Sequence, residues 1–404
     1  MSAISKGSPR VSPPPGGRPI SPAYNGLVGT WLEGWAALGV GVTNCLTAGL
    51  RAAPLPLDLP RWLALATEGG RPSWATPHEI VFDTPIARLR DFSGSAGRGI
   101  VPTLVLPPQA GHDSCIVDYA TGQSQMQTIV ASGLTRAYTL DWKGATPETA
   151  DAAIEEYLDV IDAAIEHCGG RVNLIGDCQG GWLATIYAAL APERVNTLTI
   201  AGAPIDFHAG EPVIGEVLRW LAPGGDLSFY EALVAADGGV LKGEHMLDGF
   251  IMIQPGAEVL RQLDLLCHLG DTGYVKRYRE FETWFKHTQD IPGVFYLWIV
   301  AHLFRDNALI DGTLAVRGEL VDLAALDMPL NLLAGAKDHI TPPDQVFAIA
   351  DYATTPAEQV SRRISSGGHL GLFMGHEALA EHWPVLMAEV LRHSKPGRTV
   401  VRSR

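Results

Sequence analysis

Residues 174–182 read LIGDCQGGW, where an apolar run ends at Gly176 and Cys178 stands two places further on. The apolar run predicts a buried strand, and GGWLATIYAALAP (180–192) predicts a helix, so the cysteine occupies a strand-to-helix turn. In a nucleophile elbow the residue at such a turn is held in a strained backbone conformation. Glycines two places before and after it avoid collisions with neighbouring backbone, and Gly176 and Gly180 meet that requirement.

The residues around this turn suggest how a thiol would be activated. The helix after Cys178 would direct its N-terminal dipole at the sulfur, which favours the thiolate. The backbone N–H of Gln179 can stabilise an oxyanion, and we expect a second N–H from the loop PPQAGHDS, at Gly111. His112 in the same loop is a candidate supporting hydrogen-bond donor. The alternative is a buried structural cysteine beside a glycine turn, but the flanking strand and helix favour a nucleophile.

A nucleophilic thiol needs a base and an acid that orients the base. In α/β-hydrolases these follow in the chain order nucleophile, Asp, His. Asp338 lies in NLLAGAKDHITPP after a predicted strand, and His369 lies in the glycine-rich SSGGHLGLF before a helix. His339 adjoins Asp338 and points to a different side, so we assign it a supporting place. A surface-turn acid and a helix-capping histidine are the structural alternatives, but the order of all three residues favours a Cys178–His369–Asp338 triad.

Strand and helix patterns alternate through most of the chain outside this turn. Strands are predicted at 99–108, 136–142, 172–177 and 195–204, and helices at 124–134, 146–170 and 180–192. This alternation predicts a mostly parallel sheet with helices on both faces. It stops after Asp206 for over a hundred aromatic-rich, mostly helical residues, and it resumes at MPLNLLAGAKDHITPP (328–343), with a final helix around 376–393.

These patterns predict an α/β-hydrolase fold with an inserted, mainly helical cap. The expected parts are a disordered tail (1–25), an N-terminal helical extension (26–77), a core (78–206 and 323–395), the cap insertion (207–322) and a second tail (396–404). Residues 26–50 are long enough to cross a membrane, but Glu33, Asn44 and six glycines favour a packed or surface-associated helix.

The composition of the 404 residues excludes several classes of function. The net charge is −14 and no basic run occurs, which argues against nucleic acid as a partner. The five cysteines contain no C-x-x-C pair, so neither a disulfide framework nor a zinc ribbon is indicated, and a reducing, cytoplasmic location is the simplest reading. No histidine pair has metal-ligand spacing and no phosphate-binding loop occurs, so we expect neither a metal nor a cofactor.

At this point the sequence resembles the polyhydroxyalkanoate synthase family, most closely its class III catalytic subunits. The similarity covers roughly residues 95–392, and its motifs follow one another in the same order as in that family. The stretches that carry it are NLIGDCQGGW (173–182), APERVNTLTIAGAPIDF (191–207), REFETWFKH (279–287), RGELVDL (317–323), AGAKDHITPP (334–343) and SGGHLGLFMG (366–375).

The resemblance implies an acyltransferase that moves 3-hydroxyacyl groups from CoA onto a growing polyester. Cys178 would be the acylated nucleophile and His369 its base, while Asp338 would orient the histidine or assist the incoming hydroxyl. A thiolate suits thioester exchange, because transfer from the CoA sulfur to an enzyme sulfur is close to isoenergetic. The partners that it implies are 3-hydroxyacyl-CoA or polyester, a second copy of the chain or an accessory subunit, and the surface of a polyester granule.

Two alternatives stay open at the level of the sequence. The Gly-His loop at 111–112 and the acid Asp177 beside the nucleophile differ from the synthases, which keeps a hydrolase with the same triad in view: a depolymerase, esterase or thioesterase. If the Asp177 carboxylate faced the sulfur, it would raise the thiol pKa and oppose the helix dipole. A non-catalytic granule-surface or scaffold protein is the third reading, and the glycine-rich segment 26–50 motivates it.

Overall fold

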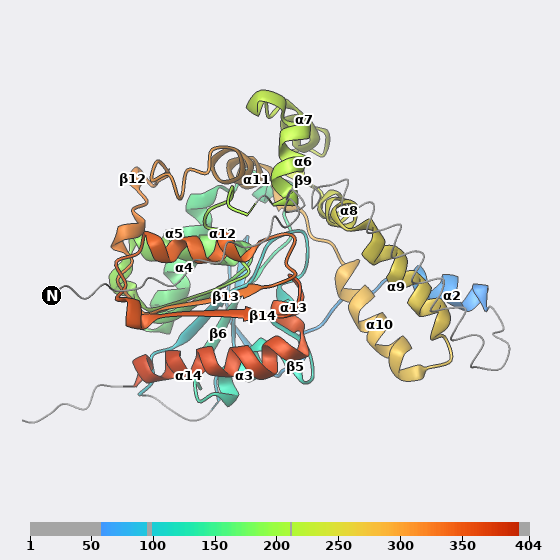
Figure 1. Cartoon of the computed structure of the whole chain (residues 1–404), viewed down its shortest axis with the longest axis horizontal. Coiled ribbons are helices and arrows are strands. Elements are labelled where there is room, and N and C mark those ends of the chain that lie inside the picture. Colours follow the sequence, from blue (N-terminus) through green and yellow to red (C-terminus); the bar gives the residue numbers. More distant parts are fainter. Residues whose placement is uncertain (1–57, 95–98, 211, 396–404) are drawn as a thin grey trace, which may run out of the picture.

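The computed structural model describes residues 58–94, 99–210 and 212–395 and contains a central eight-stranded sheet (Figure 1). Its strand order is β1-β2-β6-β3-β7-β8-β13-β14. The strands from β6 to β14 pair in parallel, while β1 and β2 add an antiparallel edge. Their bounds are β1 Glu79–Asp83, β2 Ala87–Asp91, β3 Thr103–Leu106, β6 Ala137–Trp142, β7 Val172–Asp177, β8 Val195–Ala201, β13 Leu330–Gly335 and β14 Val360–Ser365. The predicted mostly parallel sheet is confirmed.

Helices cover both faces of this sheet, because successive side chains along each strand point to opposite faces. Leu104, Leu106 and Leu174 pack in one cluster with α4 (Ile154–Cys168) and α5 (Gln179–Leu190). Val105 and Ile175 pack in another cluster, with α3 and α14. Figure 1 shows α4, α5 and α12 on one side of the sheet and α3 and α14 on the other. The helices of the second face and of the C-terminal part are α3 Gln125–Ala131, α12 Pro343–Phe347, α13 Gly371–Met374 and α14 Trp383–Ser394.

The four predicted strands correspond to β3, β6, β7 and β8, but one predicted helix is shorter than expected. The pattern over 146–170 predicts one helix, whereas Pro147–Thr149 forms a 3-10 turn and α4 begins only at Ile154. The side chain of Glu156 accepts a hydrogen bond from the backbone N–H of Ala153 (2.9 Å), which stabilises the start at that point. The predicted Gly-Gly stop is confirmed, since Gly169 ends α4 at φ 108°.

Between β8 and β13 the chain forms the helices of the expected cap. They are α6 Val213–Leu221, α7 Ser228–Ala236, α8 Gly243–Ile253, α9 Pro255–Cys267, α10 Thr272–Phe285 and α11 Gly293–Trp298. In Figure 1, α9 and α10 extend away from the sheet beside α2 (Leu59–Ala66). The indole of Trp62 in α2 donates to the carbonyl of Gln262 in α9 (3.1 Å). The N-terminal extension therefore packs on the cap, as far as it is described.

Short elements complete the described chain. The minor strands are β4 Asp118–Ala120, β5 Gln123–Ser124, β9 Val240–Leu241, β10 Ile291–Pro292, β11 Ala315–Val316 and β12 Glu319–Leu320. The other 3-10 turns are Ser114–Val117, Pro192–Arg194, Pro223–Gly225, Leu323–Ala325, Ala348–Asp351 and Ala357–Gln359, and π-helical segments span Ile299–Arg305 and Ala378–His382. Among the described helices, none is long and apolar enough to cross a bilayer. The segment 26–50 and both predicted tails lie outside the described residues.

Candidate active site

Cys178 occupies the turn between β7 and α5, where the sequence predicts a nucleophile elbow. Its backbone has φ 50° and ψ −119°, a conformation that side chains rarely adopt. Its N–H donates to the carbonyl of Ala201 in β8 (2.8 Å), and its carbonyl accepts from Gly181 (2.8 Å). The surrounding backbone thus holds the strained residue in place, as nucleophile elbows require.

The two glycines of the motif are needed for close packing. A Cβ on Gly180 would overlap the carbonyl oxygen of Leu106 in β3, and one on Gly176 would overlap the backbone of Gly180 and Gly181. Any larger residue at either position would push α5 away from the strands. The predicted role of this glycine pair is confirmed, and it fixes the cysteine at the carboxyl end of the central strand.

The start of α5 provides a positive electrostatic environment for the sulfur. Cys178 is the N-cap of this 12-residue helix, so the positive end of the helix dipole lies beside it. Gln179 is the first residue of the helix, and its role as an oxyanion donor stays a prediction. This arrangement lowers the free energy of negative charge on Cys178 or on an adjoining carbonyl oxygen.

The structure brings Asp338 and His369 together, although 31 positions separate them. The Nδ1 atom of His369 lies 2.7 Å from Oδ2 of Asp338. The other oxygen of Asp338 accepts from the backbone N–H groups of Ile340 (2.9 Å) and Thr341 (2.8 Å). The carboxylate is therefore held by three donors and orients the imidazole, which is the part expected of the acid.

The loop that carries His369 is held from both sides. The N–H groups of Ala336 and Lys337 donate to the carbonyls of Ser365 (2.8 Å) and Gly367 (3.1 Å), which extends the pairing of β13 with β14. Glu377 accepts from the N–H (2.9 Å) and the hydroxyl (2.6 Å) of Ser366. The histidine thus lies at the ends of two adjacent parallel strands. The role of Glu377 carries no signal in the sequence.

Cys178 and His369 line the same cavity, so the structure brings the three predicted residues near one another. Burial alone would lower the pKa of His369, but the charges of Asp338 and Cys178 and the hydrogen bond to Asp338 raise it well above the usual value. The imidazole is therefore suited to hold a proton. The arrangement is chemically suited to a thiolate–imidazolium pair.

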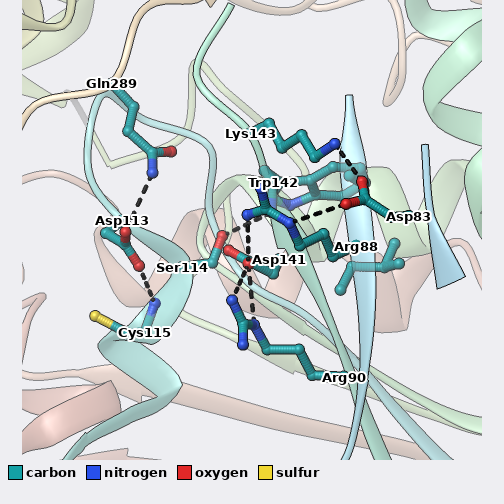
Figure 2. Close-up of polar contacts among 12 residues, drawn as sticks. Asp83, Arg88, Arg90, Asp113, Ser114, Cys115, Asp141, Trp142, Lys143 and Gln289 are labelled. Atoms are coloured by element: carbon teal, nitrogen blue, oxygen red, sulfur yellow. Dashed lines mark hydrogen bonds and ion pairs between the residues drawn. The ribbon is translucent and has the colours of Figure 1, made fainter. Parts of the chain in front are cut away.

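The loop expected to supply the second oxyanion donor is anchored by a network of polar contacts (Figure 2). Asp113 accepts from the N–H of Cys115 (2.9 Å) and from the side-chain amide of Gln289 (3.2 Å). The hydroxyl of Ser114 accepts from the N–H of Trp142 in β6 (3.0 Å). The neighbouring residue of that strand, Asp141, accepts from both Nε and Nη2 of Arg90, and Lys143 pairs with Asp83. The loop is thereby fixed to the edge of the sheet.

Within this loop, Gly111 packs against the cap and does not line the cavity around Cys178. Its φ is +85°, and a Cβ there would lie 2.8 Å from Cβ of Met246 in α8. Its carbonyl accepts from the N–H of Gln289 (2.8 Å). Its neighbours Ala110 and His112 line the cavity around Cys178, whereas Gly111 is not among the lining residues. The glycine is required for cap docking, and its oxyanion role stays a prediction.

The two other predicted histidines have different environments. His112 stacks on Trp284 (ring centroids 4.8 Å apart) and on Phe285 (5.5 Å), and burial lowers its pKa to about 4. It is therefore neutral and forms part of the cavity wall. His339 is exposed at the cavity mouth near Lys337. Among the described residues, no hydrogen bond joins either ring to Cys178, Asp338 or His369, so the supporting donor role of both stays a prediction.

A cavity of about 350 Å³ lies between these residues and the cap. Its floor includes Cys178 and His369, and its roof is mainly apolar, formed by residues of α8, α9 and α10: Phe250, Ile251, Ala257, Phe281, Trp284 and Phe285. Arg261 and Glu258 are the charged residues of that roof. A larger recess of about 660 Å³ shares Trp284 as a wall, but it contains none of the triad. The reacting atoms therefore belong to the smaller cavity.

Asp177, beside the nucleophile, does not lie at the surface of the cavity. It is fully buried, and its Oδ1 accepts from the side-chain amide of Gln125 in α3 (3.2 Å). Burial raises the pKa of Asp177 to about 8, while Gln125 and His369 act in the opposite direction. The sequence points to Asp177 but gives no signal for Gln125, because only the packing of α3 brings the two together.

The other groups of chemical interest in the described chain are its cysteines and its possible metal ligands. Cys115, Cys168 and Cys178 are free thiols, and the first two are buried. Cys267 is disulfide-bonded, which departs from the expectation that the cysteines are reduced. No group of three or more His, Cys, Asp or Glu side chains suited to a metal occurs among the described residues.

The sequence matches known proteins over most of its length. A family model described as "Protein of unknown function (DUF3141)" matches residues 95–387. The subunit PhaC of the poly(3-hydroxyalkanoate) polymerase of Haloferax mediterranei is 27% identical over 331 residues, covering 80% of this chain and 65% of its own. The corresponding subunits of Allochromatium vinosum and Synechocystis are 25% and 27% identical and are covered to 75% and 80%. The resemblance to polyhydroxyalkanoate synthases is confirmed, although the chain spans just under two thirds of the Haloferax relative.

Two solved structures are similar to this chain at low identity. An epoxide hydrolase of Bacillus megaterium is 13% identical with a TM-score of 0.45, covering 78% of this chain and 100% of its own. A monoacylglycerol lipase of Paleococcus ferrophilus is 17% identical with the same TM-score, covering 76% and 99%. The α/β-hydrolase fold itself follows from the strand order and the elbow described above.

Proposed function

This chain belongs to the family described as "Protein of unknown function (DUF3141)", and we propose that it is an acyltransferase that extends a poly(3-hydroxyalkanoate) chain through an acyl group on Cys178. The observation that carries the proposal is that one thiol lines the same apolar cavity as an imidazole that is hydrogen-bonded to a carboxylate. The similarity to poly(3-hydroxyalkanoate) polymerase subunits supports the choice of substrate class.

The first step would be attack of the Cys178 sulfur on the thioester carbonyl of a 3-hydroxyacyl-CoA. His369 takes the thiol proton, and the carbonyl oxygen becomes negative beside the N–H of Gln179. Collapse of this intermediate breaks the bond to the CoA sulfur, which leaves with the proton from His369. Sulfur replaces sulfur, so the acyl group stays activated for the next transfer.

The second step would transfer the acyl group to a hydroxyl group. The hydroxyl end of a growing chain or of another 3-hydroxyacyl group gives its proton to His369 and attacks the Cys178 thioester. An ester bond forms, and the thiol is regenerated. Water is the competing nucleophile, so the apolar roof of the cavity would suppress hydrolysis.

The test follows the acyl group on the intact protein. Purified protein is mixed briefly with 3-hydroxybutyryl-CoA, and its mass is measured, with Cys178→Ala as the matched control. We expect one or more hydroxybutyryl units on the native chain, no addition on the variant, and later release of polymer. Release of CoA with free acid alone would exclude polymer extension.

A hydrolase with the same residues is the second candidate. The specific observation in its favour is the Gly-His loop, whose His112 is a neutral cavity wall against α10. The assay is release of soluble 3-hydroxyacids from amorphous polymer or oligomers, again with Cys178→Ala as control. A protein inert toward each ester and thioester offered would remove both candidates and leave the scaffold reading.

A further inference from the structure

Asp177 presents a buried carboxyl group directly beside the proposed nucleophile. It is the last residue of β7 and has no exposed surface. Side chains alternate along a strand, so Asp177 shares a face with Ile175, whose cluster contains Met126 of α3 and Leu386 of α14. Gln125, the first residue of α3, is also fully buried and donates its side-chain N–H to Oδ1 of Asp177 (3.2 Å).

The second polar atom of each side chain lacks a partner. Oδ2 of Asp177 and Oε1 of Gln125 are both buried and accept no hydrogen bond from any described residue. With Asp177 ionised, both atoms are acceptors, and two acceptors cannot satisfy each other. A single proton on Oδ2 changes this, because a carboxylic acid can donate to Oε1 while Oδ1 still accepts from the amide. One proton thus satisfies two buried atoms that otherwise cost free energy.

We infer that Asp177 is a protonated positioning residue, whose neutral carboxylic acid pairs with the Gln125 amide and keeps negative charge away from the Cys178 sulfur. The inference rests on Cys178 being the nucleophile of the proposed function. It removes the conflict that the sequence presents, since a neutral acid neither opposes the dipole of α5 nor disfavours the thiolate.

The surroundings of Asp177 agree with a neutral group. Burial raises the pKa of Asp177 to about 8, although the hydrogen bond from Gln125 and the charge of His369 act in the opposite direction. The flanking strands place non-ionising residues beside this end of β7, namely Ala201 opposite Asp177 in β8 and Leu106 opposite Gly176 in β3. His369, from the loop before α13, is the ionisable group whose charge acts on it among the described residues. An ionised Asp177 would compete with the thiolate for this imidazolium.

The decisive variant is Asp177→Asn, because an asparagine amide reproduces the donor and the acceptor of a carboxylic acid but cannot ionise. The readout is the rate of alkylation of Cys178 by iodoacetamide, followed by peptide mass because Cys115 and Cys168 are also free. At pH 7 we expect the rates of variant and native protein to agree within about threefold. At pH 9 we expect the variant to react faster by up to about tenfold, the most that a one-unit effect on the thiol pKa can give.

Two results would overturn the inference. A variant that is slowed by the same large factor at both pH values would mean that the native carboxylate is needed in its charged form. A rate ratio that stays near one at both pH values, while infrared spectra show that Asp177 ionises between them, would mean that its charge has no effect on the sulfur. Alkylation needs no substrate, so an absence of polymerase and hydrolase activity would leave this measurement valid.

A second measurement is made on the native protein and so does not depend on the folding of a variant. In native protein, infrared difference spectra should contain the C=O stretch of a buried carboxylic acid that disappears with a midpoint near pH 8. The same band should be absent from Asp177→Asn. If native protein shows no such band at pH 6.5, Asp177 is not the protonated acid inferred here.

Discussion

At the scale of single residues, the chemistry depends on backbone geometry as much as on side-chain identity. Cys178 has a positive φ of 50°, and its neighbours at 176 and 180 have no Cβ because none fits. The cysteine can therefore stand out from the end of β7 toward His369. The acid is equally constrained, since Asp338 accepts from two backbone N–H groups as well as from the imidazole.

The first residue-scale prediction concerns the orientation of the base. Asp338→Asn should lower the rate of Cys178 acylation by about 10²–10⁴, because an amide cannot hold the imidazole in the same tautomer or stabilise its charged form. His369→Gln should lower it at least as far. Single-turnover acylation with 3-hydroxybutyryl-CoA measures both, and circular dichroism controls for folding. Near-native rates in both variants would exclude the triad.

The second residue-scale prediction concerns stability and pH. Asp177 has a folded-state pKa raised from 3.8 to about 8, so between these values the folded state binds a proton that the unfolded state has lost. The free energy of unfolding should therefore fall as pH rises through this window. Asp177→Asn should remove that part of the dependence. Urea unfolding at pH 5, 6.5 and 8 measures both slopes, and parallel slopes would contradict the assignment.

At the scale of elements, the ends of β3, β7, β13 and β14 position the site, and the antiparallel edge fixes the loop beside it. Asp141 of β6 is 4% exposed and accepts from Nε (2.9 Å) and Nη2 (2.6 Å) of Arg90 in β2. The next residue, Trp142, donates its N–H to Ser114. These neighbouring contacts hold β2 against β6 and also hold the loop at 107–114 in place.

The element-scale prediction is that Asp141→Asn destabilises the fold by about 3–5 kcal/mol, because it leaves the charge of Arg90 largely buried without a counter-ion. Urea denaturation gives the value. The double variant Asp141→Leu with Arg90→Met removes both charges and should recover a substantial part of the loss. A double variant as unstable as the single one would show that packing, and not the unpaired charge, explains the loss.

At the scale of the whole molecule, the cavity exists because the cap meets the core. Trp284 of α10 is 2% exposed, and its indole N–H donates to the carbonyl of Asp113 (3.0 Å), while its ring stacks on His112. The same ring separates the cavity that contains Cys178 from the larger recess. Loss of this residue would connect the two spaces and admit water to the acyl group.

The whole-molecule prediction is that Trp284→Ala raises the ratio of free hydroxyacid to polymer formed from 3-hydroxybutyryl-CoA, because water then competes better for the acyl group. The truncation should also cost about 3–5 kcal/mol of stability. Trp284→Phe, which keeps a six-membered aromatic ring but loses the pyrrole ring with its N–H, should change the ratio less. Trp220→Ala is the matched control, since Trp220 is 73% exposed. An unchanged ratio in Trp284→Ala would exclude this ring as the barrier to water.

Local sequence pattern is enough to predict several parts of this protein. Period and composition predict β3, β6, β7 and β8, the spacing of glycines predicts the elbow at Cys178, and chain order predicts Asp338 and His369. The start of α4 was predicted too early, because the proline at 147 favours a 3-10 turn there and the capping by Glu156 sets the start at Ile154.

Contacts between side chains that lie far apart in the chain arise only when helices and strands pack together. The pairing of Gln125 with Asp177, the stacking of His112 on Trp284 and the separation of Gly111 from the cavity all depend on helices packing against strand ends. Such contacts carry no local periodicity, since they join segments more than fifty positions apart. Burial of this kind also sets the charge of Asp177 and His112, because a carboxyl group and an imidazole removed from water both favour their neutral forms.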